Sequence, residues 1–261
     1  MTFEATPYPE INAVLHELHA GARAILGRQL VGFYLEGSLA LGGFAPDRSD
    51  IDFVMVTDGE CSVETFNELK TMHERIANGA SKWARELEGS YISRRALRHD
   101  RQPAAHPNLE RYSSLVMVRP ETGYWIIHRH ILREHGIALA GPPPRTLIDP
   151  VEPDDLRAAV LGILREWWRP MLVDGPLLRH GGYRRYAVLT MSRMLYTMRH
   201  GAITTKPIAA TWAEETLDQR WVSLVRVALA PSTDAAPDLD ATVAYIGYTC
   251  ECAERSASSE K

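Results

Sequence analysis

A proline-rich segment, GPPPRTLIDPVEP at residues 141–153, separates two kinds of sequence pattern. Before it, strand-like apolar runs alternate with amphipathic helical stretches, whereas after it only helical periodicity is present. Because proline ends helices and stiffens connections, we expect a domain boundary here. The pattern predicts a small domain of strands and helices over residues 1–150, a helical bundle over 151–256 and a disordered tail at 257–261.

Periodicity and turn residues place the individual elements. Helical spacing in the first part predicts three helices: one that opens at Pro9, one over 63–78 and one over 123–135. Apolar and β-branched runs predict four strands: 29–37, 51–57, 87–93 and 113–119. The second part contains five helical segments: 154–168, 184–201, 206–217, 219–230 and 239–254.

Composition narrows the classes of function. The 261 residues carry a formal net charge of -4, which gives no basic footprint for nucleic acid. No apolar stretch approaches the roughly 20 residues that span a bilayer, and the N-terminus lacks the pattern of a signal peptide. Cys61, Cys250 and Cys252 make no disulfide framework, so we interpret them as reduced thiols. We expect a cytoplasmic monomer without a nucleic-acid or membrane partner.

Two aspartates stand at the entrance of the strand predicted over residues 51–57. Asp50 and Asp52 alternate with Ile51 and Phe53, so both carboxylates project from one face of the strand. Carboxylates at this spacing repel each other, and a hard divalent cation such as Mg²⁺ offsets the repulsion. A D-x-D at a loop-to-strand junction is also typical of a cap or turn acid. Both interpretations stay open on these residues alone.

A phosphate-binding element precedes the aspartates. Gly37 and Ser38 end the preceding strand, and the loop LALGGFAPDRS at residues 39–49 leads from them to the aspartates. Glycine lets the backbone approach a ligand closely, while a serine hydroxyl and nearby amides can cradle phosphate oxygens. Phosphate donors beside metal ligands are the two parts that nucleotidyl transfer needs.

G-S, a short loop and D-x-D on a strand together resemble the polymerase-β-like nucleotidyltransferase superfamily. Two longer stretches, at residues 131–151 and 188–213, look like the corresponding stretches of bacterial aminoglycoside adenylyltransferases of the streptomycin and spectinomycin type. The resemblance runs in the same order from about Val31 to Ala228. It implies an α+β fold, with a small mixed-sheet polymerase-β-like domain followed by an all-α bundle. It also implies transfer of AMP from Mg²⁺–ATP to a hydroxyl of a small acceptor, an aminoglycoside or aminocyclitol antibiotic.

The resemblance further assigns catalytic roles. Asp50 and Asp52 would hold Mg²⁺, with ATP as the co-substrate. The family carries its general base, a glutamate, on the strand after the D-x-D strand, and Glu88 in RELEGSYIS is the position that aligns. Glu86 lies two residues away and would share the face of Glu88 in an extended strand, so it is the competing candidate.

Four further residues would bind the nucleotide by the same resemblance. Gly37 and Ser38 are the phosphate-binding pair described above. Arg193 lies among apolar neighbours in TMSRMLY, where its charge needs a partner such as a triphosphate. Lys206 stands before Pro207 at a helix start, where an anion is favoured. A salt bridge for Arg193 and a solvated loop for Lys206 are the structural alternatives.

The segment implied to contact the acceptor departs from the family pattern. In MLVDGPLLRHGGYRR, residues 171–185, Asp174 stands at roughly the position of a tryptophan in those enzymes. Arginine, histidine and tyrosine stand where acidic residues are expected, so a polycationic drug would meet less negative charge. The pair Trp167–Trp168 would line the acceptor site or pack within the bundle, and packing is favoured.

Other functions find less support in the sequence. His128, His130 and His135 share a predicted helix, but no H-E-x-x-H pattern supports zinc. An adenylyltransferase that modifies a protein partner, in the manner of antitoxins, is usually a minimal single domain, unlike this chain. A non-catalytic nucleotide-binding protein would have no need of Asp50, Asp52 and Glu88 together.

Overall fold

The computed structural model describes residues 4–99, 105–119, 123–231 and 235–259. These residues group into two compact units, one drawn from residues 1–120 and 128–150 and the other from residues 121–127 and 151–261. Within the described ranges, no helix combines the length and the apolar character needed to cross a membrane. The domain boundary at residue 150 remains a prediction.

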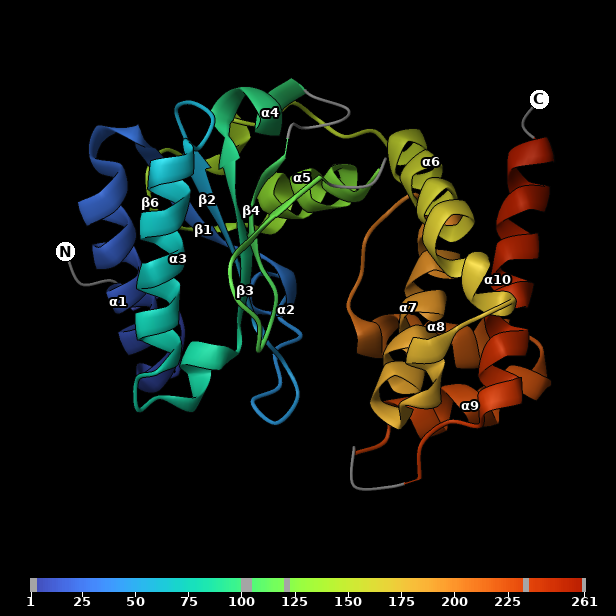
Figure 1. Ribbon diagram of the computed structural model, residues 1–261. Coiled ribbons are helices and arrows are strands. Elements are labelled where there is room, and N and C mark those ends of the chain that lie inside the picture. The colour runs from blue at the N-terminus through green and yellow to red at the C-terminus, as the bar shows by residue number, and fades with distance from the viewer. Residues whose placement is uncertain (1–3, 100–104, 120–122, 232–234, 260–261) are drawn as a thin grey trace. The chain divides into compact units, whose positions relative to one another are not determined.

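The first unit is built on a six-stranded mixed sheet with the strand order β5-β4-β3-β2-β1-β6 (Figure 1). Its strands are β1 (Leu30–Leu35), β2 (Ile51–Thr57), β3 (Leu87–Ser93), β4 (His106–Leu109), β5 (Val116–Val118) and β6 (Ile137–Ala140). Only the β2–β3 pair is parallel, and the other neighbouring strands pair antiparallel. The mixed sheet confirms the fold class that the sequence predicts.

Two long helices cover one face of this sheet. Figure 1 shows α1 (Pro9–Leu26) and α3 (Val63–Ala77) side by side over the strands, with α5 (Tyr124–His135) on the other face. Pro9 occupies the first turn of α1, and the Ser62 side chain caps α3 by accepting from the Thr65 amide. An apolar stripe along α1 is buried in the core at five positions: Ile11, Val14, Leu15, Leu18 and Ala22. Ile25 is only half-buried, and Leu26 is buried instead.

The remaining elements of this unit are short. They are the helices α2 (Gly37–Ala40) and α4 (Arg94–His99) and the 3₁₀ turns Gly27–Gln29, Lys82–Arg85 and Pro144–Thr146. Strands β4 and β6 have no counterpart among the predicted elements. Each is only four residues long, and β4 contains Pro107, which argues against a strand in a sequence pattern. Pairing with neighbouring strands, which the local sequence does not encode, creates them.

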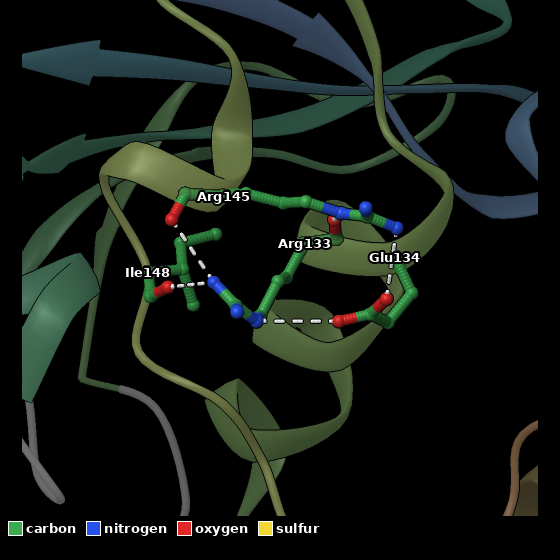
Figure 2. Close-up of polar contacts among 4 residues, drawn as sticks. All are labelled: Arg133, Glu134, Arg145 and Ile148. Atoms are coloured by element: carbon green, nitrogen blue, oxygen red, sulfur yellow. Dashed lines mark hydrogen bonds and ion pairs between the residues drawn. The ribbon is translucent and has the colours of Figure 1, made fainter.

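The proline-rich segment is hydrogen-bonded to the end of α5 (Figure 2). Arg133 donates from one guanidinium nitrogen to the carbonyl oxygens of Arg145, at 2.9 Å, and Ile148, at 2.6 Å. Arg145 in turn donates to the Glu134 carboxylate at 3.1 Å. Exposed ion pairs of this kind contribute little individually, but the carbonyl contacts satisfy backbone groups that irregular proline-rich chain leaves open.

The second unit is a bundle of helices. Its α-helices are α6 (Pro153–Ile163), α7 (Gly181–His200), α8 (Lys206–Thr216), α9 (Gln219–Leu229) and α10 (Leu239–Ser259). A π-helical turn, Leu164–Trp168, extends α6, and 3₁₀ turns at Pro170–Leu172 and Pro176–Arg179 lead to α7. The core centres on α7, whose Val188 and Met191 pack in one cluster with Trp168, Val225 and Tyr245. The five helical segments predicted for this part are all present.

Two boundaries differ from the sequence-based ones. Helix α10 continues through Ser259, so residues 257–259 are helical where a disordered tail is predicted, and the rest of that tail lies outside the described residues. The hydroxyl of Ser258 bonds the Glu254 carbonyl within that last turn. The start of α5 belongs to the second unit, because Gly123 lies directly against Ala159 of α6.

The buried histidine of α3 predicts a pH dependence of stability. His73 is 4% exposed, and its Nε2 lies 2.9 Å from the Tyr91 hydroxyl. Burial lowers the pKa of His73 from 6.5 to about 4. Unfolded His73 therefore binds a proton below pH 6.5 while the folded form does not, so stability present above pH 6.5 is lost as the pH falls toward 4. We expect a loss of about 2 kcal/mol between pH 7.5 and 5.

Urea unfolding at the two pH values measures this loss. His73→Gln should remove about 2 kcal/mol of the pH dependence, whereas His135→Gln, at an exposed position on α5, should leave it in place. An unchanged pH dependence in His73→Gln would show that the histidine is protonated in the folded protein.

Candidate active site

The ends of three strands meet at one edge of the sheet. Strand β1 runs antiparallel to β2, with Leu35 opposite Phe53, so the residues after β1 lie beside the start of β2. Strand β3 runs parallel to β2, and Asp52 is paired with Glu88. The structure thus brings Gly37, Asp52 and Glu88 together, although 51 residues of sequence separate the first from the last.

Gly37 is fitted against Asp52. Its φ of +58° is in the left-handed region, and a Cβ at this position would lie 1.8 Å from Asp52 Oδ2. The backbone amide of Ser38 hydrogen-bonds the Asp52 carboxylate. The Ser38 hydroxyl is buried and has no hydrogen-bond partner among the described residues. The backbone of the turn after β1 therefore holds Asp52, and the Ser38 hydroxyl remains available to a ligand.

The carboxylates at this edge repel one another. Burial raises the pKa of Asp52 well above its ordinary value, and the charges of Asp50, Glu36 and Glu88 raise it further. The hydrogen bond from Ser38 opposes this shift. Asp50 and Asp52 thus have the negative potential that attracts a cation.

Glu88 has the properties of a general base. Burial, and then the charge of Asp50, raise the pKa of Glu88 from 4.5 to about 7, although His128 and Arg111 act in the opposite direction. A carboxylate with a pKa near neutrality accepts a proton more readily than an ordinary glutamate does. Its pairing with Asp52 places it one strand away from the aspartates.

Glu86 lies in a different environment. It follows the 3₁₀ turn Lys82–Arg85 and precedes β3, so it does not share a strand face with Glu88. Its carboxylate forms an ion pair with Arg111 at 2.5 Å and accepts a hydrogen bond from the Tyr112 hydroxyl. The side chain of Glu86 is therefore already engaged by two neighbours.

One acidic residue of this edge, Glu36, was not predicted from the sequence. Glu36 is 5% exposed, and its Oε1 lies 2.7 Å from Nδ1 of His128 on α5. Burial lowers the pKa of His128, but the charge and hydrogen bond of Glu36, with a contribution from Glu88, raise it above 6.5 overall. The available signal was a charged residue at the end of the apolar run FYLEGS, directly before Gly37.

Across the described ranges, no group of three or more His, Cys, Asp or Glu side chains is arranged to hold a metal ion by itself. A cation at Asp50 and Asp52 would accordingly take its remaining ligands from water and substrate. Mg²⁺ is commonly bound in this way, by one or two carboxylates plus substrate phosphates.

The two basic residues implied to bind the nucleotide belong to the second unit. Arg193 lies on α7, and its Nε is buried without a hydrogen-bond partner among the described residues. Lys206 is the first residue of α8, and its Nζ lies 5.5 Å from the centre of the Tyr186 ring. Gly37, Ser38, Asp50, Asp52 and Glu88 all belong to the first unit.

The segment implied to contact the acceptor contains three arginines, and two of them hydrogen-bond the main chain of the bundle. Arg184 donates to the carbonyls of Pro237, Leu178 and Arg179, and Arg185 donates to those of Val227, Ala230 and Ala235. These two charges satisfy backbone carbonyls within the bundle. Asp174 is exposed. Trp168 is buried in the core, whereas Trp167 is 40% exposed and donates to the Tyr183 hydroxyl.

Known proteins resemble the chain along nearly its whole length. Residues 146–243 match the family model described as aminoglycoside adenylyltransferase, C-terminal domain. An aminoglycoside (3'') (9) adenylyltransferase of Shigella flexneri is 27% identical over 261 residues, 97% of this chain and 92% of that protein. A spectinomycin 9-adenylyltransferase of Staphylococcus aureus is 28% identical over 219 residues, 78% of each.

The fold also has a counterpart among solved structures. The crystal structure of a spectinomycin adenyltransferase from Enterococcus faecialis with ATP and spectinomycin matches with a TM-score of 0.72. The match covers 92% of this chain and 98% of that one at 16% sequence identity, so it is evidence of a shared fold. The chain is therefore a homologue of the aminoglycoside and spectinomycin adenylyltransferases, and the resemblance predicted from its sequence is confirmed.

Proposed function

We propose that the chain transfers AMP from ATP to a hydroxyl of an aminoglycoside or aminocyclitol antibiotic. The observation that carries this proposal is the meeting of Asp50, Asp52 and Glu88 at one sheet edge, beside the turn of Gly37 and Ser38. Acidic side chains and phosphate-binding backbone at one place suit a reaction at a phosphorus atom. We infer the class of acceptor from the names of the similar proteins, which are aminoglycoside and spectinomycin adenylyltransferases.

Asp50 and Asp52 would hold Mg²⁺. The mutual repulsion of the carboxylates at this edge supports the assignment, because a divalent cation would offset it. Bound there, Mg²⁺ would supply neutralisation of the charge on the phosphates of ATP.

Glu88 would act as the general base. Its carboxylate takes the proton of the acceptor hydroxyl as that oxygen forms a bond to the α-phosphorus of ATP. The bond between the α-phosphorus and the bridging oxygen breaks, and its electron pair leaves with pyrophosphate. The products are the adenylylated acceptor and pyrophosphate, and the pKa of about 7 suits Glu88 to this task.

The nucleotide phosphates would be bound by Ser38, Arg193 and Lys206. The buried Ser38 hydroxyl and the buried Nε of Arg193 both lack hydrogen-bond partners among the described residues, and a phosphate oxygen would satisfy either. Gly37 would permit close approach of the backbone. We further propose that the protein acts as a cytoplasmic monomer without nucleic acid.

Two arginines of the segment implied to contact the acceptor would be held in place by the bundle. Because Arg184 and Arg185 are engaged by carbonyls, their hydrogen-bond donors would be occupied within the bundle, although their positive charges remain. The absence of the expected tryptophan, with Asp174 at that position, still predicts a choice of drug that differs from that of the relatives.

Pyrophosphate release tests the reaction class. In the presence of Mg²⁺ and ATP, the purified chain should release pyrophosphate with at least one member of a panel of aminoglycosides and spectinomycin. Asp52→Asn should abolish the release, because the carboxylate for the cation is lost while the fold is kept. Release that is independent of every acceptor, or that survives Asp52→Asn, contradicts the proposal.

Paired substitutions test the general base. Glu88→Gln keeps the shape of the side chain but accepts no proton, so turnover should fall by about 10²- to 10⁴-fold while calorimetry still detects ATP binding. Glu86→Gln is the matched control, since that carboxylate is engaged by Arg111 and Tyr112, and turnover should change less than about 10-fold. The reverse pattern would assign the base to Glu86.

Glycine substitutions test the turn after β1. Gly37→Ala adds a Cβ that collides with Asp52 Oδ2, so we expect turnover to fall by at least about 100-fold, through misplacement of a catalytic group. Gly42→Ala is the matched control, because Gly42 also has a positive φ of +74° but a Cβ there meets nothing within 4 Å. Both variants share the backbone strain, and equal activities would show that the contact with Asp52 has no functional role.

A further inference from the structure

The two carboxylate oxygens of Glu36 have different surroundings. Its Oε1 is bound by His128, but its Oε2 is buried and has no hydrogen-bond partner among the described residues. A buried carboxylate oxygen without a partner is destabilising. Oε2 of Glu36 therefore requires a partner in addition to His128.

The position of Glu36 indicates what that partner is. The residue directly precedes Gly37, and its backbone amide donates to the Asp52 carbonyl at 3.1 Å. The negative charge of the Glu36 side chain also acts on the Asp52 carboxylate. Two negative groups so placed are stabilised when positive charge lies near both, and His128 supplies such a charge at Glu36.

We propose that Glu36 is a further member of the cation site, which holds Mg²⁺ through a water molecule bound to the ion. The inference rests on the magnesium site proposed above. No three acidic or histidine side chains in the described part of the chain are arranged to ligate one ion directly, which favours contact through water. Mg²⁺ usually keeps several waters, and groups that bind a metal's ligands tune its affinity.

His128 positions Glu36 for this role. Its Nδ1 holds Oε1 at 2.7 Å and thereby fixes the orientation of the carboxylate, while Oε2 has no hydrogen-bond partner among the described residues. The histidine comes from α5 and the glutamate from the end of β1, so the contact exists only in the folded unit.

Binding of Mn²⁺, a paramagnetic substitute for Mg²⁺, tests the inference without a measurement of activity. Free Mn²⁺ is followed by electron paramagnetic resonance as the full chain is titrated in the presence of an ATP analogue with a non-cleavable α,β bridge. Glu36→Gln should weaken Mn²⁺ binding by about tenfold, within the range found for groups that bind a metal's ligands. Glu60→Gln is the matched control, because Glu60 binds Ser93 at the opposite end of β3 and should leave the affinity unchanged.

Asp52→Asn separates the two proposals. If it abolishes Mn²⁺ binding while folded Glu36→Gln binds as the unaltered chain does, the role of Glu36 is overturned and the magnesium site stands. If Asp52→Asn also binds Mn²⁺ normally, both are overturned. Circular dichroism checks the fold. Should Glu36→Gln not fold, Glu36→Asp, which keeps the charge but withdraws the carboxylate, must weaken Mn²⁺ binding for the inference to hold.

Discussion

The parallel pairing of β2 with β3 is the constraint on which the candidate site depends. This is the only parallel pair in the sheet, and it sets Asp52 beside Glu88. If β3 ran antiparallel to β2, Glu88 would lie at the far end of the strand, away from the aspartates. A parallel connection needs a crossover, and α3 supplies it on the same face as α1. The helices that build the core thus also determine which carboxylates meet.

Electrostatic repulsion is concentrated where the core ends. Asp52 and Glu88 both have raised pKa values because burial and neighbouring negative charge disfavour their ionised forms. A fold selected for stability alone would avoid this arrangement, since uncompensated buried charge is costly. The chain offsets part of the repulsion with the Ser38 amide and with the positive charges of His128 and Arg111. A divalent cation would neutralise the negative charge that these groups leave uncompensated.

The helical unit shows that an arginine seen in sequence need not offer its hydrogen-bond donors to a ligand. Arg184 and Arg185 stand in the segment implied to contact the acceptor, yet their guanidinium groups bind main-chain carbonyls of the bundle. Arg193 is different, because its Nε is buried among apolar residues of α7 without a hydrogen-bond partner in the described part of the chain. A planar donor group of this kind is suited to a phosphate.

The sequence by itself determined the elements that are long and strongly periodic. It predicted β2 and β3, the helices α1, α3 and α5, and the five helices of the second unit, because each carries its own apolar pattern over many residues. It also identified Asp50, Asp52 and Glu88 as candidates, through local spacing and a family resemblance. It missed β4 and β6, which are four residues long and exist through their pairing.

Only the tertiary structure decided which carboxylates share an environment. In sequence Glu86 and Glu88 are equivalent neighbours, and the ion pair with Arg111 is what sets Glu86 apart. Glu36 appeared as a residue near the end of a predicted strand, and His128 appeared as one of three histidines on a predicted helix. Their contact joins residues 92 positions apart, so no local pattern could reveal it. Strand order and helix packing fix such long-range pairs, whereas a sequence pattern records only what near neighbours in the chain prefer.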